Sequence, residues 1–364
     1  MRRGYHRAAL GAIAVLAFSS TFAAEAAAQA IQDSTGSVVV VVTGRDGGAT
    51  LGYSVVSIAA YAREVFTNDQ GVAVLAGLPT GHATVRVRHL GYSPNEVAVL
   101  VRGGKVDTAR VAMVRIAVSL NTVRVRAIGA CTTPGPPRAA ADPAFAAVFE
   151  QLRLNADQYR LLATEYPFAY SVERESSIHY VGGDSILQRL DTINIGTGVN
   201  WHYGPGNVIS QSDDPRNRQV VFNLPALIHF AEPGFLANHC FANGGIDTTG
   251  GRKLIRIDFA ASAKIKAPDV DGSMYLDPVS YQIRQSVLRL TKIPEQTPQI
   301  VAAEVLTEFR EVLPSIALMS VIRSTNTLSA DPTRPILPDA VHETQRLLRV
   351  MFLKGKPGDP TSRP

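Results

Sequence analysis

The amino-acid sequence predicts a mostly β protein, in which a small β-sandwich is followed by an α+β domain with one long helix. Two observations favour this class. Between 36 and 127, short β-branched or alternating apolar segments recur between Gly- and Asn-containing turns, which is typical of a sandwich. After a Pro-rich segment at 131–137, one helical stripe of apolar residues precedes a second series of strand-like segments.

Residues 1–30 have the features of a secretory signal peptide. Arginines near the start give a positive region, 8–18 form an apolar stretch too short to span a bilayer, and an A-x-A pattern ends the segment at 28–30. We therefore expect an exported protein, in the periplasm, at the outer membrane or secreted. An uncleaved anchor is the alternative. After cleavage, no segment is apolar and long enough to be a transmembrane helix.

Composition and charge are those of a globular protein. Hydrophobic residues make up 46% and charged residues 18% of the chain, which excludes an intrinsically disordered polymer. The net charge of +5 is mild, and the basic residues are scattered rather than interleaved with aromatic ones. Nucleic acid is therefore not an expected partner.

The first domain is expected over 31–127. Val38–Val42 is a continuous β-branched run, which is compatible with a strand buried on both faces. The clearest strand is 83–88, where apolar residues alternate with Thr and Arg at period two. The expected strands are 38–42, 54–60, 64–67, 72–75, 83–88, 96–101, 105–113 and 120–125.

Four turn motifs occur in order along this domain. A strand ends in a polar-Gly turn at 38–48, and it is followed by T-N-D-Q-G at 67–71, L-P-T-G at 78–81 and L-G-Y-S-P at 90–94. Together they resemble the carboxypeptidase regulatory-like family, which has a transthyretin-like or immunoglobulin-like β-sandwich. The resemblance implies a non-catalytic module that assists folding, docking or surface display. It implies structural turn roles for Asp69, Gly71, Pro79, Gly81, Gly91 and Tyr92.

The segment 128–142 is expected to be a stiff Pro-rich linker. It contains Cys131, and the only other cysteine is Cys240. Because export delivers the chain to an oxidising compartment, we expect a Cys131–Cys240 disulfide, with two free buried thiols as the alternative. Neither cysteine lies in a C-x-x-C pair, so these two do not indicate a metal site.

The second domain is expected over 143–353, with a disordered tail at 354–364. Asp142-Pro143 is a good helix start, and apolar residues spaced by three or four continue from Phe145 to Tyr159. The helix should end before Pro167. The expected strands that follow are 168–172, 254–259, 274–276, 281–290, 301–312 and 316–327, of which 301–312 could be helical by propensity.

One hairpin in this domain carries a second resemblance. The run 271–278 (DGSMYLDP), with Y-Q-I-R at 281–284, resembles a hairpin of bacterial envelope proteins with a lipoprotein-carrier-like open β-barrel. The resemblance implies an antiparallel sheet curved around a helix, and it raises lipid binding as an alternative. The sequence lacks a dense apolar lining for a lipid cavity.

Candidate catalytic residues are few. His229 and Glu232 have the H-x-x-E spacing of a zinc site, and His342 lies downstream as a third ligand. We interpret the spacing as chance, because only Glu343 and Asp359 follow as acidic residues and neither is placed as a general base. Motifs such as H-E-x-x-H and G-x-S-x-G are absent from the sequence.

Two aromatic groupings have a second interpretation. Trp201-His202-Tyr203 could stack on a sugar ring, but the favoured interpretation is a strand with one buried and one exposed aromatic. His239 beside Cys240 could activate a thiolate, but the expected disulfide excludes that role.

The sequence therefore predicts a non-enzymatic binding or assembly module of the bacterial cell envelope, with no cofactor. Its expected partner is an envelope protein, a glycan or a lipid. The alternatives are a metal-dependent hydrolase with a site near His229, Glu232 and His239, and a periplasmic lipid or lipoprotein carrier.

Overall fold

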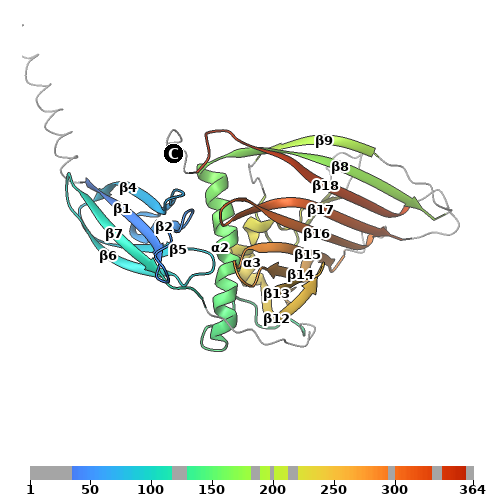
Figure 1. Cartoon of the computed structure of the whole chain (residues 1–364). Helices are drawn as coiled ribbons and strands as arrows, with labels where there is room; N and C mark the ends of the chain where they lie inside the picture. Colours follow the sequence, from blue (N-terminus) through green and yellow to red (C-terminus); the bar gives the residue numbers. More distant parts are fainter. Residues whose placement is uncertain are drawn as a thin grey trace, which may run out of the picture.

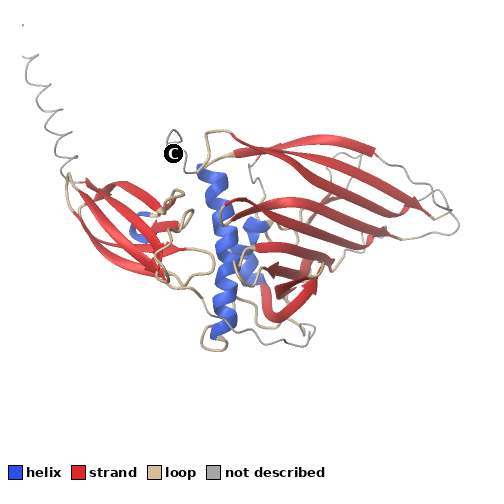
Figure 2. Ribbon diagram, in the orientation of Figure 1, coloured by secondary structure: helices blue, strands red, loops and turns tan. Residues whose placement is uncertain are grey.

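The structure is a computed structural model that describes residues 35–116, 129–181, 189–196, 201–211, 220–293, 300–329 and 338–357. The predicted signal peptide and the predicted strand at 120–125 lie outside these residues, as does most of the predicted tail. The mostly β class with one long helix is confirmed (Figures 1 and 2).

The N-terminal part is a β-sandwich of two sheets, ordered β4-β1-β7 and β3-β2-β5-β6. Alternate residues of β1, including Val38, Val40 and Val42, are fully buried between the sheets. The other face of β1 is only half-buried, so burial on both faces was a wrong expectation. The elements are β1 (Thr35–Gly44), β2 (Val55–Ile58), η1 (Ala59–Tyr61), β3 (Arg63–Phe66), β4 (Val72–Pro79), β5 (Gly81–Arg88), β6 (Asn95–Val101) and β7 (Val106–Met113).

The C-terminal part consists of α2 (Pro143–Glu165) and a nine-stranded antiparallel sheet in the order β12-β13-β14-β15-β16-β17-β18-β8-β9. Asp142 caps α2 by accepting a hydrogen bond from the Phe145 N–H at 2.9 Å, with Pro143 at the first position, as predicted. The segment 301–312 is strand rather than helix. The sheet strands are β8 (Phe168–Tyr180), β9 (Arg189–Gly196), β12 (His239–Thr249), β13 (Arg252–Ala261), β14 (Asp269–Leu276), β15 (Ile283–Thr291), β16 (Ile300–Leu313), β17 (Ile316–Leu328) and β18 (Pro338–Phe352).

Between β9 and β12 the chain forms short elements on the helix side of the sheet. They are β10 (Ile209–Gln211), β11 (Val220–Phe222), η2 (Leu227–Ala231) and α3 (Pro233–Asn238). Phe230 and Phe235 from these elements pack with Phe149 and Leu152 of α2 against Phe259 of the sheet. The space between α2 and this part of the sheet is therefore filled by side chains.

Helix α2 lies between the sandwich and the large sheet (Figure 1). A second stripe on it, Leu154, Leu161 and Leu162, faces a different core from the Phe149 stripe. That core joins the helix to both sheet systems. Its other buried members come from the sandwich (Tyr53, Val55, Phe66, Leu90) and from the large sheet (Phe168, Ile316, Leu318).

Polar contacts also hold the sandwich on α2. Arg88 at the end of β5 contacts Asp157 of α2 at 2.5 Å and Glu64 of β3 at 3.0 Å. Arg160, one turn further along α2, also bonds Glu64. Gln151 of α2 accepts a hydrogen bond from the backbone N–H of Gly91 in the sandwich at 2.8 Å. These contacts fix the position of the sandwich on the helix.

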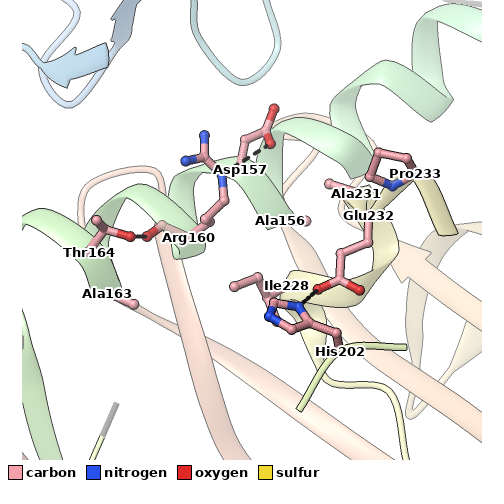
Figure 3. A pocket seen from close by; sticks show the side chains of 10 residues that line it. All are labelled: Ala156, Asp157, Arg160, Ala163, Thr164, His202, Ile228, Ala231, Glu232 and Pro233. Atoms are coloured by element: carbon pink, nitrogen blue, oxygen red, sulfur yellow. Dashed lines mark hydrogen bonds and ion pairs between the residues drawn. The ribbon is translucent and has the colours of Figure 1, made fainter. Parts of the chain in front are cut away.

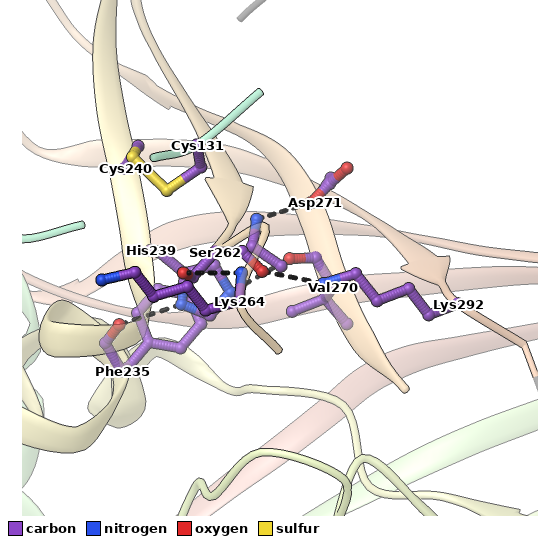
Figure 4. Close-up of a disulfide and its surroundings, with 10 residues drawn as sticks. Cys131, Phe235, His239, Cys240, Ser262, Lys264, Val270, Asp271 and Lys292 are labelled. Atoms are coloured by element: carbon purple, nitrogen blue, oxygen red, sulfur yellow. Dashed lines mark hydrogen bonds between the residues drawn. A yellow bond between two sulfur atoms is a disulfide. The ribbon is translucent and has the colours of Figure 1, made fainter. Parts of the chain in front are cut away.

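The predicted Cys131–Cys240 disulfide is present (Figure 4). It closes a sequence separation of 109 residues and ties the segment before α2 to the first residues of β12. Backbone hydrogen bonds reinforce the attachment: Ala263 donates to Cys131 O at 2.8 Å, and Gly135 donates to His239 O at 2.9 Å.

Candidate functional site

The candidate site is a surface hollow of about 490 Å³ between α2, η2 and α3 (Figure 3). Small apolar side chains form much of its lining, and polar side chains project from two sides. The lining residues are Ala156, Asp157, Arg160, Ala163, Thr164, His202, Ile228, Ala231, Glu232 and Pro233.

One side of the hollow carries a histidine–carboxylate pair. His202 Nδ1 lies 3.3 Å from Glu232 Oε1, and the backbone N–H of Tyr203 donates to Glu232 Oε2 at 3.2 Å. Glu232 precedes α3, whose first residue is a proline, so the turn between η2 and α3 positions the carboxylate. The His202 side chain is 85% exposed, which leaves most of its ring open to solvent.

The opposite side is formed by α2. Arg160 and Asp157 lie one turn apart there, and Arg160 is also bonded to Glu64 of the sandwich. The Thr164 hydroxyl donates to the Arg160 carbonyl at 2.9 Å, so it is not poised as a nucleophile. The described lining therefore offers hydrogen-bond donors and acceptors above an apolar floor, a combination suited to holding a polar ligand.

The predicted zinc-type residues are not assembled into a site. The two ring nitrogens of His229 lie 2.8 Å from the Ala226 backbone nitrogen and 3.1 Å from the Trp201 carbonyl. Glu232 is directed to His202 instead, and His342 lies on β18. Within the described part of the chain, no three His, Cys, Asp or Glu residues are grouped to hold a metal ion.

His239 is a buried structural residue. Its Nδ1 lies 2.9 Å from the Phe235 carbonyl, and its Nε2 lies 3.1 Å from the Val270 carbonyl (Figure 4). The same Nε2 lies 3.4 Å from Asp269 Oδ1. The Tyr203 hydroxyl donates to the same carboxylate at 2.7 Å. Burial, and next this hydrogen bond, raise the pKa of Tyr203, so it stays a neutral donor. Cys240 is held in the disulfide and has no free thiol for His239 to activate.

The aromatic pair beside His202 is directed inward. Trp201 packs edge-on against His229 with ring centroids 4.5 Å apart, and Tyr203 is 7% exposed. The segment is irregular rather than a strand, and the exposed member is the histidine between the two aromatics. Tyr203 is therefore not free to stack on a sugar, and Trp201 is partly buried against the core.

The turn residues of the sandwich have structural environments. Gly71, Gly81 and Gly91 all have positive φ, which side chains rarely adopt. At Gly71 a Cβ would also lie 2.6 Å from the Val42 carbonyl. Tyr92 is buried in the sandwich core, under the guanidinium of Arg115. Asp69 follows Asn68 in the turn before β4, and Pro79 ends β4.

The sequence reasoning missed Asp157 and Arg160. The apolar stripe of the helix was visible in the sequence, but neither residue belongs to it. What distinguishes them is their position, on the turn of the helix where its buried residues change from one hydrophobic core to the other.

Comparisons with known proteins identify no family. No family model matches, and no curated protein matches. The resemblance to carboxypeptidase regulatory-like domains therefore stays a prediction. Within the described residues, no helix is long and apolar enough to cross a membrane.

Several solved structures align with parts of the chain. A DUF1329 family protein from Desulfovibrio piger is 10% identical over 57% of this chain and 93% of its own, with a TM-score of 0.32. A LolA superfamily protein from Nitrosomonas europaea is 7% identical over 56% and 92%, with a TM-score of 0.29. A minor pilin of Streptococcus agalactiae is 19% identical over 25% of this chain, with a TM-score of 0.21, and the match spans 49% of the pilin.

Proposed function

We propose that this protein is an exported, non-catalytic binding or assembly module of the bacterial cell envelope. The observation that supports this proposal is the filled space between α2 and the sheet, where Phe149, Phe230, Phe235 and Phe259 pack together. A carrier of acyl chains needs an apolar cavity, and a filled core suits a scaffold whose partners bind at the surface. The hollow beside His202 is the proposed contact site for a polar segment of the partner.

The side of β8, β9 and β18 that faces the helix also favours a scaffold over a lipid carrier. Arg174 of β8 makes a two-pronged ion pair with Asp191 of β9, at 3.0 and 2.8 Å. Next to it, Gln345 donates to Glu343 of β18 at 2.6 Å. These residues lie on the face that Val172 and Phe168 share with the helix. Charged and amide groups there are a poor lining for an acyl chain.

Lipid content tests this proposal directly. The full chain would be purified from an envelope fraction without detergent, extracted, and assayed for bound lipid by mass spectrometry, with titration of a fluorescent fatty acid as a second measurement. We expect no stoichiometric lipid and no saturable uptake. One lipid per chain would overturn the scaffold proposal and favour the carrier.

Location is tested separately by cell fractionation with thiol alkylation. We expect the protein in periplasmic, outer-membrane or medium fractions, with Cys131 and Cys240 protected from alkylation until reductant is added. A cytoplasmic protein with two reactive thiols would contradict export.

A further inference from the structure

Two histidines lie side by side on the face of the large sheet that points away from α2. His179 is on β8 and His342 on β18, and the strands pair so that His342 opposes Ser177 while His179 opposes Ala340. The two histidines are therefore diagonal neighbours on one face. Because Val172 of β8 is fully buried on the helix side, His179, seven residues further along, points to the other side.

The distance between the two rings fits joint coordination of a metal ion. Their centroids are 5.3 Å apart, and the rings meet edge to face. A metal held at about 2.1 Å by one nitrogen from each of two imidazoles, at a tetrahedral angle, keeps the ring centroids about 5 Å apart. The separation thus suits a shared ion without movement of either strand, once the side chains rotate to direct one nitrogen of each ring at the ion.

A neighbouring hydroxyl lies beside one of the two ring nitrogens of His342. Thr325 Oγ1 on β17 lies 3.1 Å from His342 Nδ1. When Nδ1–H donates to this hydroxyl, the lone pair is on Nε2, and the ring is held in position. Metal-binding histidines commonly have such a partner on their second nitrogen.

We propose that His179 and His342 form a surface site for a late first-row divalent metal ion, in the class of Cu²⁺, Ni²⁺ and Zn²⁺. Imidazole nitrogen suits these ions, whereas Mg²⁺ and Ca²⁺ require oxygen ligands. No third His, Cys, Asp or Glu completes the cluster within the described residues, so water fills the remaining positions. The site is separate from the hollow beside His202 and does not rest on the proposed function.

Titration of the full chain with each metal salt alone tests the proposal. Isothermal calorimetry should show one saturable site, with Cu²⁺ tightest and no uptake of Mg²⁺. With Cu²⁺ bound, electron paramagnetic resonance should show hyperfine coupling to imidazole nitrogen. His179→Gln and His342→Gln should each abolish that site, and Thr325→Val should weaken it by about tenfold.

Two control variants locate the site. His82→Gln changes an exposed histidine on β5, and His202→Gln changes the exposed histidine of the hollow. Both should bind metal like the unchanged protein. Loss of binding in His202→Gln with retention in His342→Gln would overturn the proposal and move the site to the hollow. Absence of any saturable metal binding to the unchanged protein would also overturn the proposal. Circular dichroism spectra that match that of the unchanged protein establish that each variant is folded.

Discussion

At the scale of single residues, a buried amide connects the helix to the turn between β14 and β15. Asn155 of α2 accepts a hydrogen bond from Ile283 N–H and donates one to the Tyr281 carbonyl, both at 2.9 Å. It is 4% exposed, so water cannot replace it. We expect its contribution to exceed that of a surface amide, because its loss removes the acceptor of a backbone N–H in the core, that of Ile283.

Asn155→Ala should therefore lower the free energy of unfolding by about 1–3 kcal/mol. Asn95→Ala is the matched control, because Asn95 also donates to a backbone carbonyl, that of Ala112, but at the surface. The control should change stability by less than about 0.5 kcal/mol. Urea unfolding measures both, and equal losses would refute the special role of Asn155.

His89 gives the stability a pH dependence. Burial, and next the positive charge of Arg115, lower its pKa to about 4, while the unfolded histidine titrates near 6.5. As pH falls from about 6.5 to about 4, His89 binds a proton in the unfolded chain but stays neutral in the folded protein. Unfolding is thereby favoured by up to about 3 kcal/mol.

The variant His89→Gln should flatten the fall in unfolding free energy between pH 6.5 and 4. His82→Gln, at an exposed position, should keep the slope of the unchanged protein. Denaturation curves at several pH values measure the slope of unfolding free energy against pH. An unchanged slope in His89→Gln would show that groups other than His89 cause the pH dependence.

At the scale of elements, the sequence predicted what local chemistry controls. The Asp142 cap, the apolar stripe of α2 and most strands followed from short-range patterns. The partial exposure of one face of β1 could not be predicted in this way, because a run of valines does not indicate which face the second sheet covers. The role of Asn155 was equally hidden, since its partners lie more than 120 residues away.

Strand β14 depends on a glycine for its contacts with both neighbouring strands, β13 and β15. Gly272 pairs with Phe259, and a Cβ at this position would lie 2.0 Å from the Val287 carbonyl and 2.9 Å from the Phe259 ring. Gly272→Ala should therefore destabilise the protein by about 1–3 kcal/mol through overpacking. Gly129→Ala, where a Cβ meets nothing within 4 Å, is the control and should be neutral. Thermal melting compares the two, and a neutral Gly272→Ala would contradict this packing.

At the scale of the whole molecule, a partly buried ion-pair network fixes the sandwich on α2. Arg88→Gln removes the partner of Asp157 and Glu64, at a site where the arginine side chain is 17% exposed. We expect a loss of about 1–3 kcal/mol in unfolding free energy, as for hydrogen bonds to charged groups.

Arg86→Gln is the matched control on the same strand. Arg86 lies 3.6 Å from Glu96, and both side chains are largely exposed. Its loss should cost less than about 1 kcal/mol. Chemical denaturation of both variants provides the comparison, and an equal cost would show that the Arg88 network does not hold the two parts together.

The candidate site belongs to this scale as well, and this is why the sequence could not predict it. His202 precedes β10, Glu232 lies between η2 and α3, and Arg160 comes from α2, 42 positions before His202 in the printed sequence. No local spacing joins them. The H-x-x-E spacing of His229 and Glu232 was visible in the sequence, but the fold directs these two side chains to different partners.

Helix α2 has one stripe in each of two cores, and this couples the folding of the two parts. Release of the sandwich would expose Leu154, Leu161 and Leu162 to water, while loss of the large sheet would remove the support on which the sandwich rests. The described parts should thus unfold together, as one cooperative unit. Calorimetry should show a single heat-absorption peak whose van't Hoff and calorimetric enthalpies agree, and two resolved peaks would mean that the helix transmits no coupling.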